Sequence, residues 1–475
     1  MGKSKAVGPD NIPIEVWMSL GEKGIQWLTN FFNVILRTRK MPEAWRVSTL
    51  IPIFKNKGDA QGCENYRGIK LLSHTMKLWE RVIEKRIRRE TVIRENQFGF
   101  MPGRSTTEAI HILRRLMEKY RERKKDLHLV FIDLEKAYDS IPRSLVWDSL
   151  KNRGISRRYI EVIQDMYDRV ATNIHTPAGM TESFPINVGL HQGSALSPFI
   201  FTVIMEELSK SIWETVPWCM LFADDIVLAA ETKEEANSKL GEWREALEGK
   251  GLRISRTKTE YLRCNFNGIE SLGEPEVTIG GEVVACTSKF KYLGSVIQSD
   301  GEIDGDVTNR IQAGWLKWRA ATGVLCDKKF PRRLKGKFYR VAIRPAMLYG
   351  TECWPVKKVF EQRMEVTEMR MLRWMCGKTM LDRIRNQEFR ETLRVAPISA
   401  KMRENRLRWF GHVQRKTHDA PVRRIECIIV EGKRSRGRPK RTWEEQIKSD
   451  MHELHLSKDL TRDKASWRRL IQVLD

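Results

Sequence analysis

The chain has 475 residues, 41% of them hydrophobic, which suits roughly two to four domains of about 100–200 residues and excludes global disorder. Lys and Arg number 85 against 61 Asp and Glu, and the net charge of +24 favours a polyanionic partner, since binding phosphates releases counterions. Composition alone does not separate nucleic acid from an anionic membrane surface. No apolar run approaches the roughly 18 residues of a membrane-spanning helix, no apolar signal segment follows the first residues, and we expect no membrane partner.

The N-terminal part of the chain predicts a helix followed by a strand. Apolar residues recur with helical spacing over residues 13–36, with a break near Gly21–Gly24. Residues 47–54, VSTLIPIF, have the composition of a strand, and Pro52 within it indicates an edge position or an irregularity.

Two compact apolar runs stand out in the middle of the chain. LHLVFIDLE at 127–135 ends in a carboxylate, and WCMLFADDIVLAA at 218–230 is interrupted by two aspartates; each predicts a buried strand. Together with their surroundings they indicate an α+β arrangement. The surrounding segments predict helices at 71–89, 105–124 (with Ser105 or Thr106 as N-cap), 143–152, 157–169, after Pro198 and at 233–250, and a hairpin near 170–188.

Three aspartates lie in the apolar runs that predict buried strands. An unpaired buried carboxylate is costly, so Asp133, Asp224 and Asp225 must be neutralised, paired or metal-bound. Adjacent residues of a strand point to opposite faces, but at a hairpin tip Asp224 and Asp225 can approach one site. Mg²⁺ suits such an oxygen-rich cluster. For the Asp-Asp pair alone, an ordinary acidic turn between two strands remains the alternative.

The eight cysteines, from Cys63 to Cys427, include no C-x-x-C pair, and we expect the reduced, buried thiols of an intracellular protein. A zinc set drawn from Cys353, Cys376, His412, His418 and Cys427 matches no common spacing.

At this point the sequence resembles reverse transcriptases, in particular those of non-LTR (LINE-type) retrotransposons. The similar motifs follow one another in the family's order over about residues 8–300. They are MPEAWRVSTLIPIFKNKGD (41–59), ENYRGIKLLS (64–73), QFGFMPGRSTTEAI (97–110), VFIDLEKAYDSIPR (130–143), GLHQGSALSPFIF (189–201), FADD (222–225), GLRISRTKTE (251–260) and FKYLGSVI (290–297). RLRWFGHVQR (406–415) and GRPKRTW (437–443) are similar to C-terminal segments of RTE-like LINE elements.

The resemblance implies an α+β right-hand polymerase. We expect an N-terminal extension and fingers at 1–125, a palm with a small antiparallel sheet at 126–298, a helical thumb at 299–380, and a basic helical tail at 381–475. These four names are used below for the same ranges.

The resemblance also implies the metal site. Asp133 and Asp224 would hold two Mg²⁺ ions, with Mn²⁺ as the alternative ion, and Asp225 would support them. The carbonyl of Leu134 would be a further ligand. Lys258 would act as the general acid that protonates the departing pyrophosphate, although a lone lysine between two threonines carries no such meaning by itself.

Five further residues match the family's nucleotide-binding positions. Tyr138 would be the steric gate that rejects a ribose 2′-hydroxyl; the family more often has Phe there, and a tyrosine packed in the core is the alternative. Gln192 and Gly193 would contact the template and the incoming nucleotide. Lys55 and Arg67 would grip the triphosphate, their alternative being solvated surface charges.

The segment FKYLGSVI implies a primer grip formed by Tyr292, Leu293 and Gly294, which would place the primer end.

The basic tail contains SRGRPKR at 435–441, which resembles an AT-hook core and also fits a nuclear-import patch, so we expect nuclear localisation. A solvated charge run between two helices is the alternative. Trp409, Phe410 and Trp443 beside arginines fit either base stacking or helix packing, and packing is favoured. The nucleic-acid-binding residues expected in this segment are Arg436, Arg438, Lys440 and Arg441.

These motifs predict an RNA-directed DNA polymerase that works on an RNA template, a DNA primer and dNTPs, with element RNA and target DNA as further partners. A retroelement remnant that only binds nucleic acid is the alternative, although it would be free to lose Asp133, Gln192, Asp224 or Asp225, and all four are present. Full LINE proteins of this type carry an N-terminal endonuclease; we expect none here, because the chain begins almost at the fingers.

Overall fold

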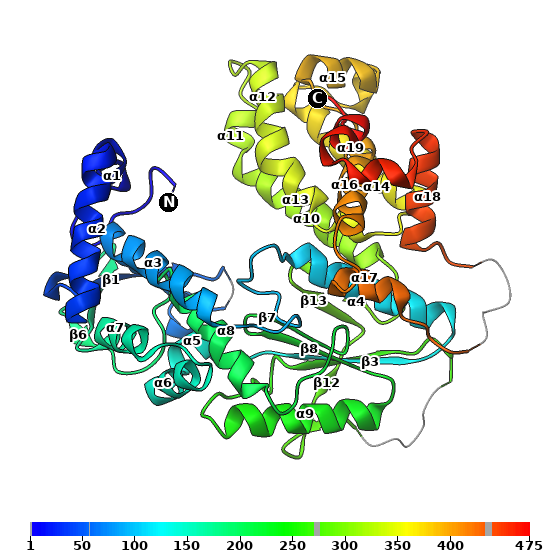
Figure 1. Cartoon of the computed structure of the whole chain (residues 1–475). Helices are drawn as coiled ribbons and strands as arrows, with labels where there is room; N and C mark the ends of the chain where they lie inside the picture. The colour runs from blue at the N-terminus through cyan, green and yellow to red at the C-terminus, as the bar shows by residue number, and fades with distance from the viewer. Residues whose placement is uncertain (1, 57, 270–275, 433–438) are drawn as a thin grey trace.

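The computed structural model describes residues 2–56, 58–269, 276–432 and 439–475. The palm forms the base of the molecule, and the fingers and the thumb rise from its two ends (Figure 1). None of the described helices is long and apolar enough to cross a membrane. All eight cysteines are free, as predicted, but the prediction that they are buried is correct only for Cys219, Cys264 and Cys353. The other five are partly or fully exposed, since apolar neighbours in the sequence do not fix the side of an element on which a thiol lies.

The fingers begin with two helices, α1 (Ile14–Ser19) and α2 (Gly21–Thr38), which confirms the predicted break. Strand β1 (Val47–Phe54) pairs antiparallel with β2 (Tyr66–Leu71) over Thr49–Phe54 and in parallel with β4 (Ala171–Thr176) over Val47–Leu50. It is therefore not an edge strand of the sheet, but Pro52 lies beyond the part paired with β4, where a missing N–H costs no ladder bond.

Two long helices then lead to the palm. Helix α3 (His74–Glu90) is capped by Ser73 and α4 (Thr106–Glu122) by Ser105, whose side chain accepts a hydrogen bond from the backbone N–H of Glu108. Of the two predicted caps for the second helix, the serine is the one used. A hydroxyl at this position satisfies an N–H that has no partner within the helix.

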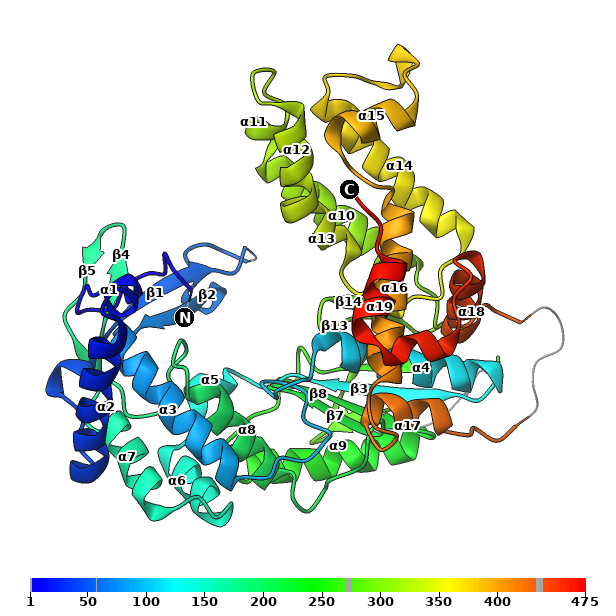
Figure 2. The ribbon, with the colours of Figure 1, turned by 45° about the horizontal axis from the view of Figure 1, so that its top comes forward.

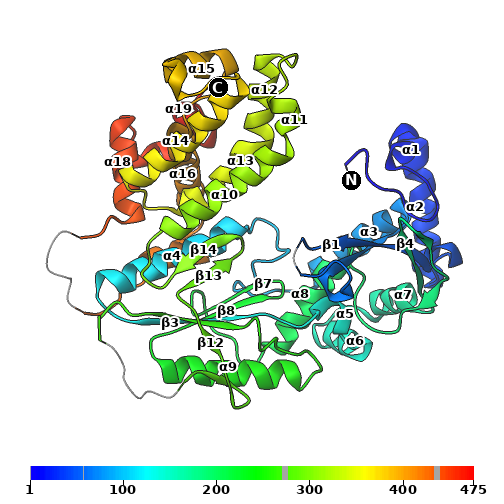
Figure 3. The ribbon, with the colours of Figure 1, turned by 180° about the vertical axis from the view of Figure 1, so that it is seen from behind.

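The palm sheet has the strand order β12-β9-β3-β8-β7. Its central strand β3 stops at Ile132, three residues before the predicted end, and the second predicted strand is a hairpin with its turn at Ala223–Asp224. Helix α9 covers one face and α4 the other (Figures 1 and 3). The elements are β3 (Leu127–Ile132), β7 (Cys219–Phe222), β8 (Asp225–Ala230), α9 (Lys233–Glu248), β9 (Glu260–Cys264) and β12 (Ala285–Cys286).

Both faces of β3 are buried, which explains its apolar run; His128, the polar residue within it, is buried too and is hydrogen-bonded to the Tyr261 hydroxyl. Val130 and Ile132 belong to the hydrophobic cluster on the α9 side, whereas Leu129 and Phe131 belong to the cluster under α4. Because successive side chains of a strand point to opposite faces, a strand between two helical layers needs apolar residues at every position.

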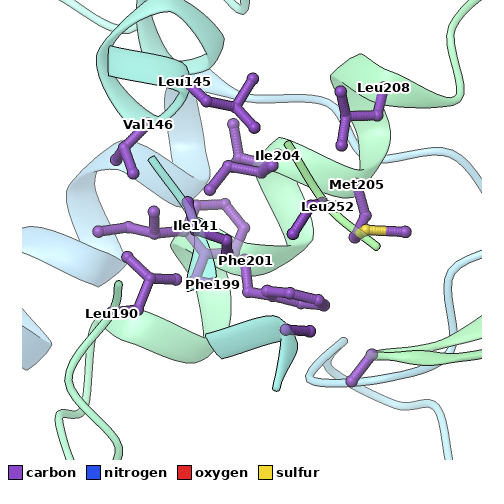
Figure 4. Packing of buried hydrophobic residues seen from close by; sticks show 14 of the residues in the cluster. Ile141, Leu145, Val146, Leu190, Phe199, Phe201, Ile204, Met205, Leu208 and Leu252 are labelled. Carbon is purple, nitrogen blue, oxygen red and sulfur yellow. The ribbon is translucent and has the colours of Figure 1, made fainter. Parts of the chain in front are cut away.

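The residues between β3 and β7 form helices that join the palm to the fingers. Helices α5 (Ala137–Ser140), α6 (Arg143–Asn152), α7 (Arg157–Tyr167) and α8 (Ser197–Leu208) flank the hairpin of β4, β5 (Gly179–Met180) and β6 (Phe184–Pro185). Figure 4 shows side chains from α6, α8 and the intervening loops meeting in one apolar cluster.

The thumb follows a small hairpin, β13 (Lys289–Tyr292) and β14 (Ser295–Gln298), and is helical as predicted. Its helices pack on a core of their own, in which Trp354 and Trp318 are buried. They are α10 (Asp304–Ala320), α11 (Thr322–Leu325), α12 (Arg332–Phe338), α13 (Arg344–Leu348) and α14 (Lys358–Met375).

The tail is helical too, but it shares its core with the rest of the molecule. The thumb core continues past residue 380 to Met402, and Val413 belongs to the palm cluster under α4. Phe410 and Trp443 are buried, which confirms the packing interpretation for both. The tail helices are α15 (Asn386–Leu393), α16 (Ile398–Gln414), α17 (Pro421–Cys427), α18 (Trp443–Glu453) and α19 (Lys464–Ile471).

Candidate active site

Asp133 follows the last residue of β3 and is held in place by two hydrogen bonds of its backbone. Its N–H donates to the hydroxyl of Thr259 (3.3 Å), and its carbonyl accepts from the N–H of Ser255 (2.8 Å). These hydrogen bonds to the loop before β9 take the place of strand pairing at Asp133, which is why β3 ends at Ile132. The carboxylate is 36% exposed and forms an ion pair with the Lys258 ammonium at 3.1 Å.

Asp224 and Asp225 lie at the tip of the β7–β8 hairpin. Phe222 pairs with Asp225 across the last rung, and Ala223, with a φ of +58°, makes the turn together with Asp224. Because β8 lies beside β3 in the sheet, the tip reaches the end of β3 where Asp133 stands.

The three carboxylates influence one another. Burial and then repulsion by Asp133 raise the pKa of Asp224, while Arg67 and Lys258 act to lower it. Burial, then Asp224 and Asp133, raise the pKa of Asp225 to about 6. Crowded like charges of this kind favour a bound cation.

The described residues contain no group of three His, Cys, Asp or Glu side chains that would by itself cage a metal. Magnesium in phosphoryl-transfer sites is bound by one or two carboxylates together with substrate phosphates, so a complete protein cage is not required. Asp133 and Asp224, with the carbonyl of Leu134 directly after the first aspartate, fit such a partial site.

The hairpin tip is held from outside by residues 96–99, a contact that the sequence analysis missed. Phe98 donates its N–H to Leu221 at 2.7 Å, and the side-chain oxygen of Gln97 accepts from the N–H groups of Gly99 (3.0 Å) and Ala223 (3.3 Å). A Cβ on Gly99 would lie 2.3 Å from the nitrogen of Ala223. The QFGF motif therefore marks the brace of the catalytic hairpin, although nothing in the sequence names its partner.

Tyr138 stacks on Phe201 with ring centroids 4.6 Å apart and an interplanar angle of 12°. Its hydroxyl is buried and has no partner within the described residues. Burial and the nearby Asp224 carboxylate raise the pKa of the Tyr138 phenol, so it stays protonated. Tyr138 therefore packs on a core residue, as the core interpretation predicts, and also lies next to the carboxylates, where a steric gate would have to be.

The loop with Gln192 and Gly193 lies against strand β2. The Gln192 side chain donates to Asp139 at 3.0 Å, and its carbonyl accepts from the Lys70 N–H at 2.8 Å. Gly193 has a φ of +112°, and a Cβ there would lie 2.5 Å from the Lys70 carbonyl oxygen, so only glycine fits. Burial and then Arg143 lower the pKa of the Lys70 ammonium to about 8. Lys70 and Asp139 thus hold this loop; both lie within the quoted motifs, but the sequence analysis gave neither a role.

A buried glutamate supports the same loop from behind. Glu80 accepts hydrogen bonds from the Ser194 hydroxyl (2.6 Å) and the Ala195 N–H (2.7 Å). Burial raises its pKa to about 7 in spite of these bonds. Ser194 in turn accepts from the N–H groups of Leu196 and Ser197, so the contact fixes the start of α8.

The two finger cations lie on the exposed β1–β2 hairpin. Arg67 is close enough to Asp224 to affect its pKa. Lys55 donates to the carbonyl of Glu64 at 2.7 Å, within its own hairpin, and also affects the pKa of Asp139. The structure therefore brings both toward the carboxylates, without a direct contact between either cation and a carboxylate.

The β13–β14 turn carries the predicted primer-grip residues. Leu293 and Gly294 form the turn, with φ values of +46° and +85°. The Leu293 carbonyl accepts from the Tyr349 hydroxyl (2.7 Å) of the thumb, whereas Tyr292 is buried and lies close enough to Asp225 for the carboxylate to raise its pKa. The turn thus links thumb and palm.

The cations predicted in the tail lie apart from this cluster. Arg436 and Arg438 fall outside the described residues. Lys440 pairs with Glu302 of the thumb at 3.0 Å, and Arg441 acts to lower the pKa of Glu361.

A five-stranded sheet with one carboxylate at the end of its central strand and two at the neighbouring hairpin tip defines the palm of a right-hand nucleic-acid polymerase. The model of the family "Reverse transcriptase (RNA-dependent DNA polymerase)" matches residues 54–297, which are 244 of the 475 residues. The chain belongs to this family.

The similar curated proteins come from non-LTR retrotransposons. The chain is 26% identical over 408 residues to the probable RNA-directed DNA polymerase from transposon BS of Drosophila melanogaster, covering 78% of this chain and 42% of that protein. It is 23% identical over 418 residues to the polymerase from mobile element jockey of Drosophila funebris, covering 84% and 45%. It thus spans less than half the length of either relative. Among solved structures, apo telomerase from Candida tropicalis overlaps with a TM-score of 0.41 at 12% identity, over 98% of this chain and 75% of that one.

Proposed function

We propose that this chain is an RNA-directed DNA polymerase that adds dNTPs to the 3′-hydroxyl of a DNA primer on an RNA template. The observation that carries the proposal is the meeting of Asp133 with Asp224 and Asp225 at the palm hairpin, where each of the last two has a raised pKa. Element RNA and target DNA are the natural templates and primers for a relative of non-LTR retrotransposon enzymes.

Two Mg²⁺ ions, or Mn²⁺ in their place, would be held by Asp133, Asp224 and the Leu134 carbonyl, with Asp225 beside them. Such ions, when bound, activate the attacking hydroxyl and stabilise the departing pyrophosphate. The protein holds the two ends of the site rigidly, because Asp133 is fixed by backbone bonds and Asp224 by the braced hairpin. Fixed ligands of this kind need no reorganisation during the reaction.

The surrounding residues orient and select the nucleotide. Arg67 supplies a guanidinium suited to phosphate oxygens, and Gln192 and Gly193 shape the base pocket. Tyr138, backed by Phe201, closes the space next to the carboxylates where a 2′-hydroxyl would lie. Lys258 neutralises Asp133 in the metal-free protein, and we propose that it turns to the pyrophosphate as its proton donor once substrate binds.

Primer extension on an RNA template with all four dNTPs and Mg²⁺ tests the proposal. Asp224→Asn removes a metal ligand and should abolish product, whereas Asp148→Asn, on the exposed face of α6, should extend the primer as the wild type does. Circular dichroism checks that both variants are folded. Equal activity of wild type and Asp224→Asn rules out the proposed site. A wild type that binds primer–template without extending it supports the alternative of a binding-only remnant.

A further inference from the structure

A pocket of about 710 Å³ lies in the thumb, between the C-terminal halves of α10 and α14 and beside α11. Both long helices run from the palm toward the free end of the thumb, so the pocket is at the end away from the palm sheet (Figure 2). It shares no residue with the carboxylate site.

Three tryptophans form its apolar surface. Trp318 is 3% exposed and forms the floor, while Trp374 is 43% exposed and stands at the opening. The three rings form a triangle, because the Trp315 ring centroid lies 5.4 Å from that of Trp374 and 6.3 Å from that of Trp318, and the last two are 6.5 Å apart. None of the three indole N–H groups donates a hydrogen bond within the described residues.

The charged side chains that line the pocket are all cationic. Arg319, Arg370 and Lys378 line the pocket, and no Asp or Glu does. Lys378 pairs with Asp382 at 3.0 Å, whereas neither arginine has a carboxylate partner in the part of the chain that the structure describes. Arg370 lies over the Trp374 ring, 6.0 Å from its centroid. A cavity with aromatic walls and unpaired guanidinium groups is complementary to a flat ring joined to an anion.

We propose that this pocket binds a nucleotide of single-stranded nucleic acid, with the base against Trp374 and Trp315 and the phosphate on Arg319 and Arg370. Aromatic platforms flanked by cations bind single strands without sequence preference, since every base has a π-face. The pocket would hold a strand segment that lies outside the primer–template duplex. The binding does not depend on catalysis.

A photocrosslinking experiment identifies the site directly. The probe is a 12-nucleotide oligouridine carrying one 5-iodouridine and a fluorescent label. The protein is the full-length Asp224→Asn variant in EDTA, saturated with an unlabelled blunt RNA–DNA duplex that occupies the polymerase cleft. We expect crosslinks that map to Trp374 or Trp315 by mass spectrometry, together with saturable binding by fluorescence anisotropy.

Substitutions then test the roles. Trp374→Ala should weaken oligouridine binding roughly tenfold or more, as expected for one stacked base, and Trp374→Phe should recover most of it. Arg370→Gln should reduce the slope of log affinity against log salt by about 0.7, the value for one phosphate contact on a single strand. Val366→Ala, on the same helix and 63% exposed, is the matched control and should change neither quantity.

Unchanged affinity in Trp374→Ala and Trp315→Ala, with crosslinks only outside α10 and α14, would overturn the proposal. A shift of Trp374→Ala from dimer to monomer in sedimentation, with unchanged oligouridine affinity, would also overturn it and assign the pocket to self-association. Because the protein already carries Asp224→Asn, failure of the proposed polymerase function leaves this experiment unaffected.

Discussion

The palm hairpin with Asp224 and the fingers hairpin with Arg67 hold charged groups in opposite ways. The palm tip is fixed by buried neighbours, Gln97 and Gly99, that contact its backbone. The fingers hairpin projects from its sheet (Figure 2), and Lys55 contacts only its own loop. Metal ligands require fixed oxygen positions, whereas cations that follow a triphosphate must adapt. Substitutions near the palm hairpin should therefore lower activity by displacing Asp224. Substitutions on the fingers hairpin should lower it by removing a positive charge.

The largest effect is expected at the brace. Gly99→Ala places a Cβ 2.3 Å from the nitrogen of Ala223, so the hairpin tip must move. A shift of about 1 Å at catalytic groups costs about 100-fold in rate, and we expect a loss of that order in primer extension. The matched control is Gly241→Ala, where no atom lies within 4 Å of the new Cβ. Equal rates for the two variants would show that the brace does not position Asp224.

Next in size is nucleotide selectivity at Tyr138. Removing the ring in Tyr138→Ala opens the space next to Asp224 and should increase incorporation of ribonucleotides relative to dNTPs by about 100-fold, the usual scale of steric discrimination against a hydroxyl. Tyr138→Phe keeps the stacking on Phe201 and should retain selectivity, since the hydroxyl has no partner. Competition assays with each NTP and its dNTP give the ratio. An unchanged ratio in Tyr138→Ala removes this residue from the gate role.

A smaller effect is expected on the exposed fingers hairpin. Arg67→Ala should raise the KM for dNTP about tenfold, corresponding to one lost charge-assisted contact, while kcat changes less. Lys55→Ala should do less, because the ammonium already donates to Glu64. Steady-state extension with varied dNTP separates KM from kcat. If Arg67→Ala lowers kcat alone, the fingers hairpin acts on the carboxylates rather than on the triphosphate.

The last prediction concerns the pH dependence of folding stability, at Glu80, rather than the reaction. Its folded-state pKa of about 7 exceeds the ordinary value of 4.5, so the folded protein holds a proton that the unfolded chain releases. Stability therefore falls as pH rises from 4.5 to 7, by about 3 kcal/mol at most, and changes no further above that. Glu80→Gln should lack this dependence. Urea unfolding of both proteins at pH 5 and pH 8 measures the difference, and parallel pH profiles would contradict it.

Strand and helix positions near the site were predictable from local pattern, and the supporting contacts were not. The apolar run 127–135 gave the central strand, but its end depends on Ser255 and Thr259, which bond to Asp133 from more than 120 residues away. The brace likewise joins Gln97 to Ala223 across the sequence. Such partners leave no periodic signal, because they depend on how the chain folds back.

In the tail, composition does not show where the residues lie. Its arginines predict nucleic-acid binding, which stays a prediction, while Trp443 and Trp467 are buried and Arg406 forms a buried ion pair with Asp450. Composition counts charges without showing where they lie. The pocket of the thumb tryptophans could not be predicted from the sequence either, since it requires α10 and α14 to be side by side.

The central claim, that Asp133 and Asp224 hold the catalytic metals, is tested most directly by counting bound Mn²⁺. Electron paramagnetic resonance on the protein with RNA template, a 3′-deoxy DNA primer and the next dNTP should show two bound ions in the wild type and in Asp148→Asn. Asp224→Asn should lose at least one ion while the primer–template stays bound. Two ions in Asp224→Asn with unchanged affinity would contradict the account.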